Sequence, residues 1–178
     1  VDRDPRSADA HYALALALDA AGRYDEARTH ALSARTLGGG GDVMVLQSLL
    51  ALRGGDTAAA RRAVEEALRG DADAARGYTQ LGLVEQGAGR YNQAREAYLH
   101  ALALDRDAYA ARYNLAALTH GVGADEEARH HLDVLLRAHP GDAAALALMR
   151  AVAAAERMPA AALRPGPTPG VTGGAGSR

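Results

Sequence analysis

The sequence predicts an all-α protein built as an α-solenoid, and three observations support this fold class. First, four segments of the 178-residue chain resemble one another and recur every 33 or 34 residues. Second, each recurrence holds two stretches with apolar residues at helical spacing, and glycines separate these stretches. Third, no segment alternates apolar and polar residues over the length of a strand. A helix pair of this size cannot bury its apolar face alone, so the pairs are expected to stack.

Each repeated segment contains the second helix of a pair and aligns on one small residue. The segments are 22–32, 55–68, 89–102 and 123–136, and their central residues are Ala27, Ala60, Ala94 and Ala128. A glycine before each segment ends the first helix, because Gly adopts the left-handed conformation of helix C-termini. Acidic or small polar residues then begin the second helix, where they cap free N–H groups or oppose the helix dipole: Asp25, Asp56, Thr57, Asn92 and Asp125. The central alanines let the paired helices approach closely.

The composition excludes several classes of protein. The chain has no Cys and no Lys, which removes thiolate nucleophiles, Cys-ligated zinc, P-loops and Schiff-base lysines. The formal net charge of −2 argues against a strongly basic nucleic-acid binder. No apolar run approaches the length of about 18 residues that a transmembrane helix needs. Arg in place of Lys, with abundant Ala and Gly, indicates GC-rich coding and hence a bacterial source.

The repeated residues resemble the tetratricopeptide repeat family, whose pattern is W-x2-L-G-x2-Y, then A-x3-F, then P, over about 34 residues. The third unit matches best, with Tyr78, Leu81 and Gly82 in the first helix and Ala94-x3-Tyr98 in the second. The resemblance implies a right-handed α-solenoid of antiparallel helix pairs. It covers about residues 1–157. In the second unit Gln47 falls where Leu is expected, and a one-residue slip near Gly54 and Gly55 would repair the match.

The resemblance divides the chain into four repeat units and three shorter segments. The units are expected at 8–41, 42–73, 74–107 and 108–141. Pro5 stands where the closing proline of an earlier unit would lie, so 1–7 is interpreted as the stub of a preceding repeat in a longer array. Residues 142–157 are expected to form a C-terminal capping helix. Residues 158–178 are rich in Pro and Gly and are expected to form a disordered or extended tail.

The family binds its partners in the concave groove, which the first helix of each pair lines. By position, the resemblance implies these groove residues: Tyr12, Leu16, Asp19, Thr79, Gln80, Leu83, Gln86, Tyr113, Asn114, Ala117 and His120. The second unit is expected to contribute residues from 45–52. Tyr offers contact area at low entropy cost, and Asn can bond to a peptide backbone. The alternative is that the tyrosines and Asn114 serve packing within the repeats.

The groove also argues against one type of partner. Chaperone-binding members of the family clamp a terminal carboxylate with Lys, Arg and Asn. This chain has no Lys, and only Arg76 and Arg112 lie near the first-helix face. Capture of an acidic chaperone tail is therefore not expected.

The histidines and glycines give no metal or phosphate site. Glu127 and His130 have the spacing of a carboxylate–histidine ligand pair, but a di-iron site needs a second such motif. The preferred interpretation is a set of exposed ion pairs, Glu126–His130 and Glu127–His131. The other histidines are expected on the surface: His11, His30, His100, His120 and His139. The glycine run 38–41 has no strand or Lys beside it and predicts a turn. No metal and no cofactor are expected.

The sequence therefore predicts a non-catalytic interaction scaffold that binds a peptide or protein partner in its groove. The alternative is an accessory or docking region of a larger enzyme or of an envelope secretion or assembly complex. A third possibility is assembly through edge-to-edge stacking of repeats. Partners are expected to be proteins and not nucleic acid, and both a cytoplasmic and a periplasmic or envelope location fit the residues.

Overall fold

A computed structural model describes residues 7–70 and 72–157, except the side chain of residue 156. Over these residues the chain forms nine α-helices and no strand, which confirms the all-α solenoid. The helices are α1 (Ala8–Ala20), α2 (Tyr24–Thr36), α3 (Gly41–Arg53), α4 (Thr57–Arg69), α5 (Ala74–Gly87), α6 (Tyr91–Leu104), α7 (Tyr109–Gly121), α8 (Asp125–Ala138) and α9 (Ala143–Arg157). The expected tail at 158–178 and all but Ser7 of the expected stub at 1–7 lie outside the described residues.

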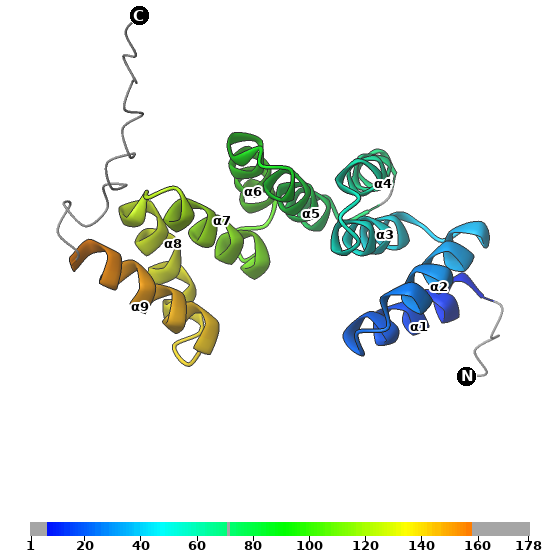
Figure 1. Ribbon diagram of the computed structural model, residues 1–178, viewed down its shortest axis with the longest axis horizontal. Coiled ribbons are helices and arrows are strands. Elements are labelled where there is room, and N and C mark those ends of the chain that lie inside the picture. The colour runs from blue at the N-terminus through cyan, green and yellow to red at the C-terminus, as the bar shows by residue number, and fades with distance from the viewer. Residues whose placement is uncertain (1–6, 71, 158–178) are drawn as a thin grey trace, which may run out of the picture.

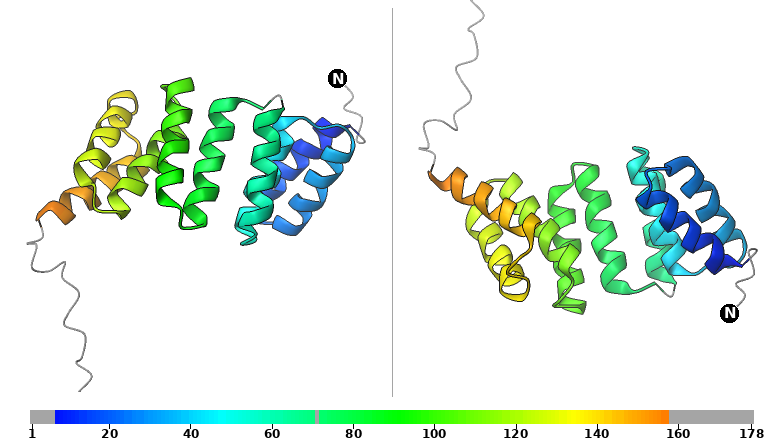
Figure 2. Two further views of the ribbon diagram at one scale, coloured as in Figure 1. Left: turned by 90° about the horizontal axis from the view of Figure 1, so that it is seen from above. Right: turned by 90° about the horizontal axis from the view of Figure 1, so that it is seen from below.

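The helices form an arch of antiparallel pairs (Figure 1). Each odd-numbered helix from α1 to α7 packs most extensively against the even-numbered helix that follows it. The backbones of the odd-numbered helices also approach one another closely from pair to pair, whereas those of successive even-numbered helices stay farther apart. Long side chains still join α2 to α4 and α6 to α8 through the Arg35–Glu66 and Arg95–Glu127 ion pairs. The first helices therefore lie closer together than the second helices, and the row curves toward them. Figure 2 shows this row from its convex side and from its concave side.

Small residues at the helix crossings explain how each pair packs. The four in-phase alanines of the second helices, Ala27, Ala60, Ala94 and Ala128, are all fully buried. The first helices place Ala15, Ser48, Gly82 and Ala116 at their own crossing position, and all four are buried as well. Because none of these side chains is larger than Ser, the paired helix axes can approach closely.

Glycines at equivalent turns set the register of the repeats. Gly22, Gly55, Gly89 and Gly123 have φ angles of 75°, 79°, 75° and 80° and close the first helix of each unit. Their spacing equals that of the four alanines, so the one-residue slip considered for the second unit does not occur. Gln47 occupies the Leu position, and its side-chain amide donates to the carbonyl of Ala31 at 3.1 Å. Leu46 is buried between the first two units.

Capping differs from the sequence prediction at three of the four second helices. Asp56 caps α4, where its carboxylate accepts a hydrogen bond from the backbone N–H of Ala59 at 2.8 Å. The N-cap residues of α2, α6 and α8 are Arg23, Arg90 and Ala124, and none of them makes a side-chain cap bond. Asp25, Asn92 and Asp125 lie inside the first turn. The two carboxylates among them favour the helix through its dipole and do not act as caps.

Candidate functional site

The concave face carries an apolar row that crosses four first helices. The row consists of Leu16 on α1, Leu49 on α3, Leu83 on α5 and Ala117 on α7, which share one repeat position. Leu16 is 38% exposed, and the other three side chains are half-buried. Leu49 lies within 45–52, the range whose register could not be assigned from the sequence pattern. The in-phase glycines of the turns would have identified it.

Two ion pairs join neighbouring first helices on the same face. Arg53 Nε lies 3.0 Å from Asp19 Oδ1, and Arg76 Nη1 lies 2.9 Å from Asp42 Oδ1. The partners of each pair are 34 residues apart, one repeat along the chain. The Arg76 guanidinium also donates to the hydroxyl of Tyr12 at 3.4 Å, so it links the third unit to the first. These pairs were not predicted from the sequence, although opposite charges one repeat apart are a recognisable signal.

Three of the predicted groove residues use their polar groups inside the fold. Thr79 and Gln80 are only 8% and 6% exposed. The Thr79 hydroxyl donates to the carbonyl of Ala75 at 2.8 Å, and the Gln80 amide donates to Ser48 Oγ at 3.3 Å. Gln86 is half-buried, and its carbonyl oxygen accepts the hydroxyl of Tyr98 at 3.0 Å. Thr79 and Gln80 therefore present little surface to the concave side.

The fourth unit completes the concave face with aromatic and polar groups. Tyr113 stacks on Tyr109 with ring centroids 6.1 Å apart, and Asn114 is half-buried beside it. Burial, together with a hydrogen bond to Asp142, raises the pKa of Tyr109 to about 12. His120 Nδ1 lies 2.6 Å from Asp125 Oδ1, so this imidazole is tied to the start of α8.

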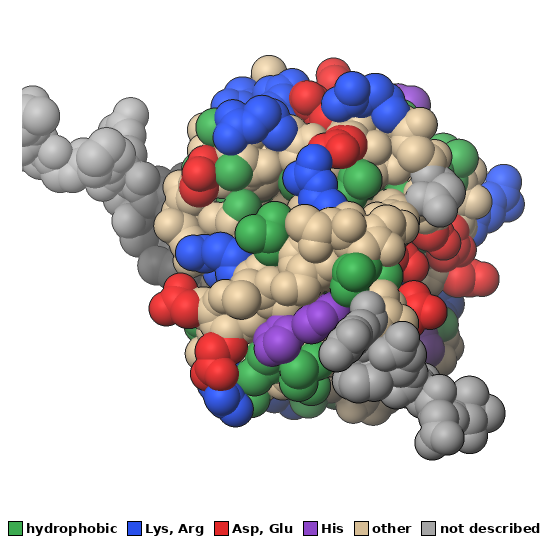
Figure 3. Space-filling model, turned by 90° about the vertical axis from the view of Figure 1, so that its right-hand side faces the viewer, with side chains coloured by type: hydrophobic (Ala, Val, Ile, Leu, Met, Phe, Trp, Pro, Cys, Tyr) green, Lys and Arg blue, Asp and Glu red, His purple; other side chains and the backbone are tan. Residues whose placement is uncertain are grey.

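Of the five histidines expected on the surface, His100 and His139 are exposed, whereas His11, His30 and His120 are half-buried. His11 and His30 are half-buried and meet with their Nδ1 atoms 2.8 Å apart, a contact between α1 and α2. Figure 3 looks at this end of the array and shows two histidines side by side. His131 is only 8% exposed, so the expected exposed pair with Glu127 is wrong on this point, although Nε2 lies 3.7 Å from Glu127 Oε1. Among the described residues no three His, Asp or Glu side chains converge as metal ligands would.

Burial of His131 predicts a pH-dependent stability. Burial lowers the pKa of His131, with Glu127 opposing this effect and Arg112 and His130 adding to it. A histidine in the unfolded chain gains its proton at about pH 6.5, which lies above the pKa of His131 in the folded state. The folded state, in which His131 is neutral, therefore has its full stability above about pH 6.5. This stability is lost as the pH falls from about 6.5 through the lower pKa of the folded state.

The prediction is tested by urea unfolding at about pH 7.5 and about pH 5. We expect His131→Gln to lose less stability between these two conditions than the unmodified protein does. His130→Gln, which changes the exposed neighbour, is the control and should behave like the unmodified protein. Equal losses in all three proteins would show that another group carries the pH dependence.

The comparisons with known proteins agree with this architecture. Two family models, both described as the tetratricopeptide repeat, match residues 1–42 and 85–152, which together make up more than half of the chain. No curated protein matches the chain significantly. Among the described helices none is long and apolar enough to span a lipid bilayer.

Several solved structures share the fold at low sequence identity. PilF of Pseudomonas aeruginosa has a TM-score of 0.74 and 19% identity, over 84% of this chain and 69% of that chain. YrrB, described as a TPR protein with an unusual peptide-binding site, has a TM-score of 0.63 and 19% identity, over 83% of this chain and 76% of that one. A chain of the APC/C hetero-tetramer Cut9–Hcn1 has a TM-score of 0.73 and 17% identity, over 82% of this chain but 30% of its own length. The repeat period, the buried crossings and the two family matches agree, and the chain belongs to the tetratricopeptide repeat family.

Proposed function

We propose that this protein is a non-catalytic scaffold that holds a peptide or protein partner on its concave face. The tetratricopeptide repeat fold supports a role in protein–protein interaction in general. The observation that supports the concave face is the apolar row of Leu16, Leu49, Leu83 and Ala117. These side chains keep exposed surface although α3, α5 and α7 are each packed between neighbouring helices.

The surroundings of the row favour a partner with apolar side chains and little net charge. The Asp19–Arg53 and Asp42–Arg76 pairs balance two carboxylates and two guanidinium groups on this face. A partner that buries the leucines gains about 25 cal/mol for each Å² of apolar surface removed from water. Tyr12 and Tyr113 add aromatic surface at the two ends of the face, and such residues are frequent anchors in interfaces.

The test compares matched double variants of the concave and convex faces. Peptides are first selected from a random peptide library on the unmodified protein, and their affinities are measured by fluorescence anisotropy. The concave variant carries Leu16→Gln and Leu83→Gln. The convex control carries Leu32→Gln and Leu99→Gln, which lie on second helices of the same two units and are 57% and 38% exposed.

We expect the concave variant to lose at least about tenfold in affinity, because truncated anchors cost about 2 kcal/mol or more each. The convex control should stay within about twofold, since energetically important contacts are few and clustered. Thermal unfolding followed by circular dichroism checks that both variants keep the fold. If the selected peptides bind the concave variant as tightly as the unmodified protein, the proposal is wrong.

A further inference from the structure

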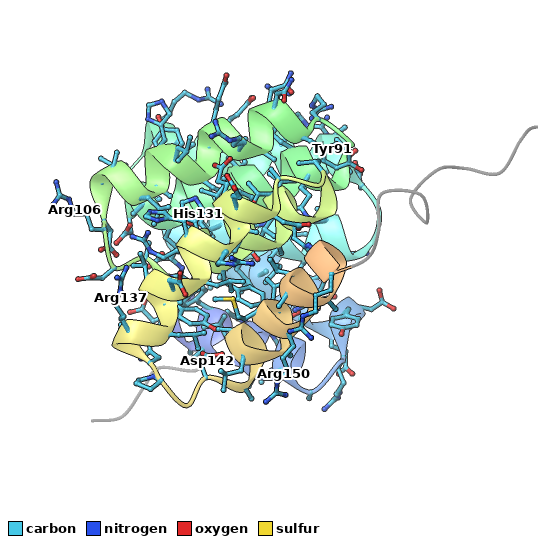
Figure 4. The ribbon with its side chains drawn as sticks, turned by 90° about the vertical axis from the view of Figure 1, so that its left-hand side faces the viewer. Tyr91, Arg106, His131, Arg137, Asp142 and Arg150 are labelled. Carbon is cyan, nitrogen blue, oxygen red and sulfur yellow. The ribbon has the colours of Figure 1, made fainter. Side chains whose placement is uncertain are left out.

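A pocket of about 360 Å³ lies away from the concave apolar row, inside the last helix pair. The loop before α7 and the first turn of α7 form one wall, and the C-terminal half of α8 forms the other. Arg106, Asp107 and Arg112 line the polar side, while Val134, Leu135 and Ala138 line the apolar side. Figure 4 looks at the end of the array where α8 and α9 lie, with Arg106, His131 and Arg137 on the same half of the view.

Arg112 forms no ion pair with any carboxylate among the described residues. In the described part of the chain only two arginines are half-buried, Arg90 and Arg112. Arg90 forms an ion pair with the buried Glu85. Arg112 donates from Nη2 to the backbone carbonyl of Arg106 at 2.6 Å, and no described carboxylate oxygen lies within 4.0 Å of it. A guanidinium has five N–H donors, so most of the donors of Arg112 remain available.

His131 lies on α8 outside the lining of the pocket. Arg112 contributes to the lowered pKa of His131, one turn before Val134 on α8. His131 is 8% exposed, and its Nδ1 atom has no hydrogen-bond partner. The pocket thus combines the guanidinium of Arg112, a second arginine and an apolar wall.

We propose that this pocket binds a carboxylate that carries an apolar group. A carboxylate accepts two parallel N–H bonds from a guanidinium in a fixed geometry. Its apolar group packs on Val134, Leu135 and Ala138, which an inorganic ion cannot cover. The volume supports this size of ligand, because a single water occupies only about 30 Å³ of liquid. Asp107 on the rim repels the ligand and limits its affinity.

The probe is N-acetyl-leucine, whose binding is followed by NMR titration of the ¹⁵N-labelled 178-residue protein. N-acetyl-leucinamide lacks the charge, and acetate and inorganic phosphate lack the apolar group. We expect saturable shifts around Tyr109, Arg112 and Leu135 with N-acetyl-leucine. Each of the other three compounds should bind at least about fivefold more weakly, because each loses one of the two contacts.

Variants of the lining residues complete the test. Arg112→Gln should weaken binding at least about tenfold, the effect of losing a charged hydrogen-bond partner. Asp107→Asn should tighten binding about two- to fivefold by removing a like charge. Arg137→Gln, an exposed arginine of α8 outside the lining, is the control and should leave binding unchanged.

Three results would overturn the proposal. The first is unchanged affinity in Arg112→Gln while its circular dichroism matches that of the unmodified protein. The second is acetate, phosphate or the amide binding as tightly as N-acetyl-leucine. The third is the absence of saturable shifts. Arg112→Lys provides a second variant if Arg112→Gln does not fold, and it should bind more weakly because it lacks the planar fork.

Discussion

Gly82→Ala is expected to destabilise the protein by about 1–3 kcal/mol, the usual cost of overpacking a well-packed core. A methyl group on Gly82 would lie 2.8 Å from Cζ of Tyr98 and closer still to two other ring carbons. The Tyr98 ring is fully buried, and its hydroxyl is held by Gln86, so it has little room to move. Ala15 and Ala116 occupy the same repeat position in their units, where Ala31 and Leu132 stand in place of Tyr98.

A double-mutant cycle tests whether Gly82 and Tyr98 are coupled in this way. Tyr98→Leu alone leaves a cavity beside Gly82 and is also expected to destabilise the protein. Adding Gly82→Ala to Tyr98→Leu should cost at least about 1 kcal/mol less than the same change in the unmodified protein. Urea unfolding of the four proteins gives the free energies of unfolding. Additive costs would show that the ring does not exclude the methyl group.

Leu115→Ala is expected to cost about 2–5 kcal/mol, whereas Leu14→Ala should cost less than about 1 kcal/mol. Both leucines hold the same repeat position, on α7 and α1. Leu115 is fully buried and packs with Ala94, Tyr98 and Leu118. Leu14 is 44% exposed, because no described helix precedes α1 as α6 precedes α7. The difference between the two substitutions measures what a neighbouring repeat contributes.

Urea unfolding followed by circular dichroism gives the free energy of unfolding of each variant. Hydrogen exchange shows which helices lose stability. Exchange should accelerate in α6 and α7 of Leu115→Ala, because each repeat depends mainly on its neighbours. In Leu14→Ala it should change little outside α1 and α2. Similar costs for the two variants would mean that the preceding helix contributes little to this position.

The repeat architecture was predictable because its signals are local. Glycines such as Gly22 and Gly89 end the first helices through their own backbone preference, and Ala27 and Ala94 mark the crossings through their size. The same spacing also resolves the second unit, where Gln47 obscured the pattern. Capping was less predictable, since Asp25 and Asn92 lie two positions beyond the N-cap residues of their helices and so do not serve as caps.

The candidate site was predictable only in part. Positions in the repeat pattern identified the helices of the concave face, and Leu16 and Leu83 lie on it with exposed or half-buried side chains. Thr79 and Gln80 come from the same helix but are buried against neighbouring atoms. Residue type and position could not separate these two groups, because burial depends on the side chains of the adjacent units.

The sequence alone therefore determined the helix pairs, their period and the family, because turns and crossings depend on residues close in the chain. Only the tertiary structure decided which charges are balanced and which polar groups are buried. Arg76 reaches Tyr12 across 64 residues, and Arg112 lies half-buried with no ion pair to a described carboxylate. Such contacts depend on how closely the curved row brings successive repeats together, and pairwise distances of that kind are not encoded in any single repeat.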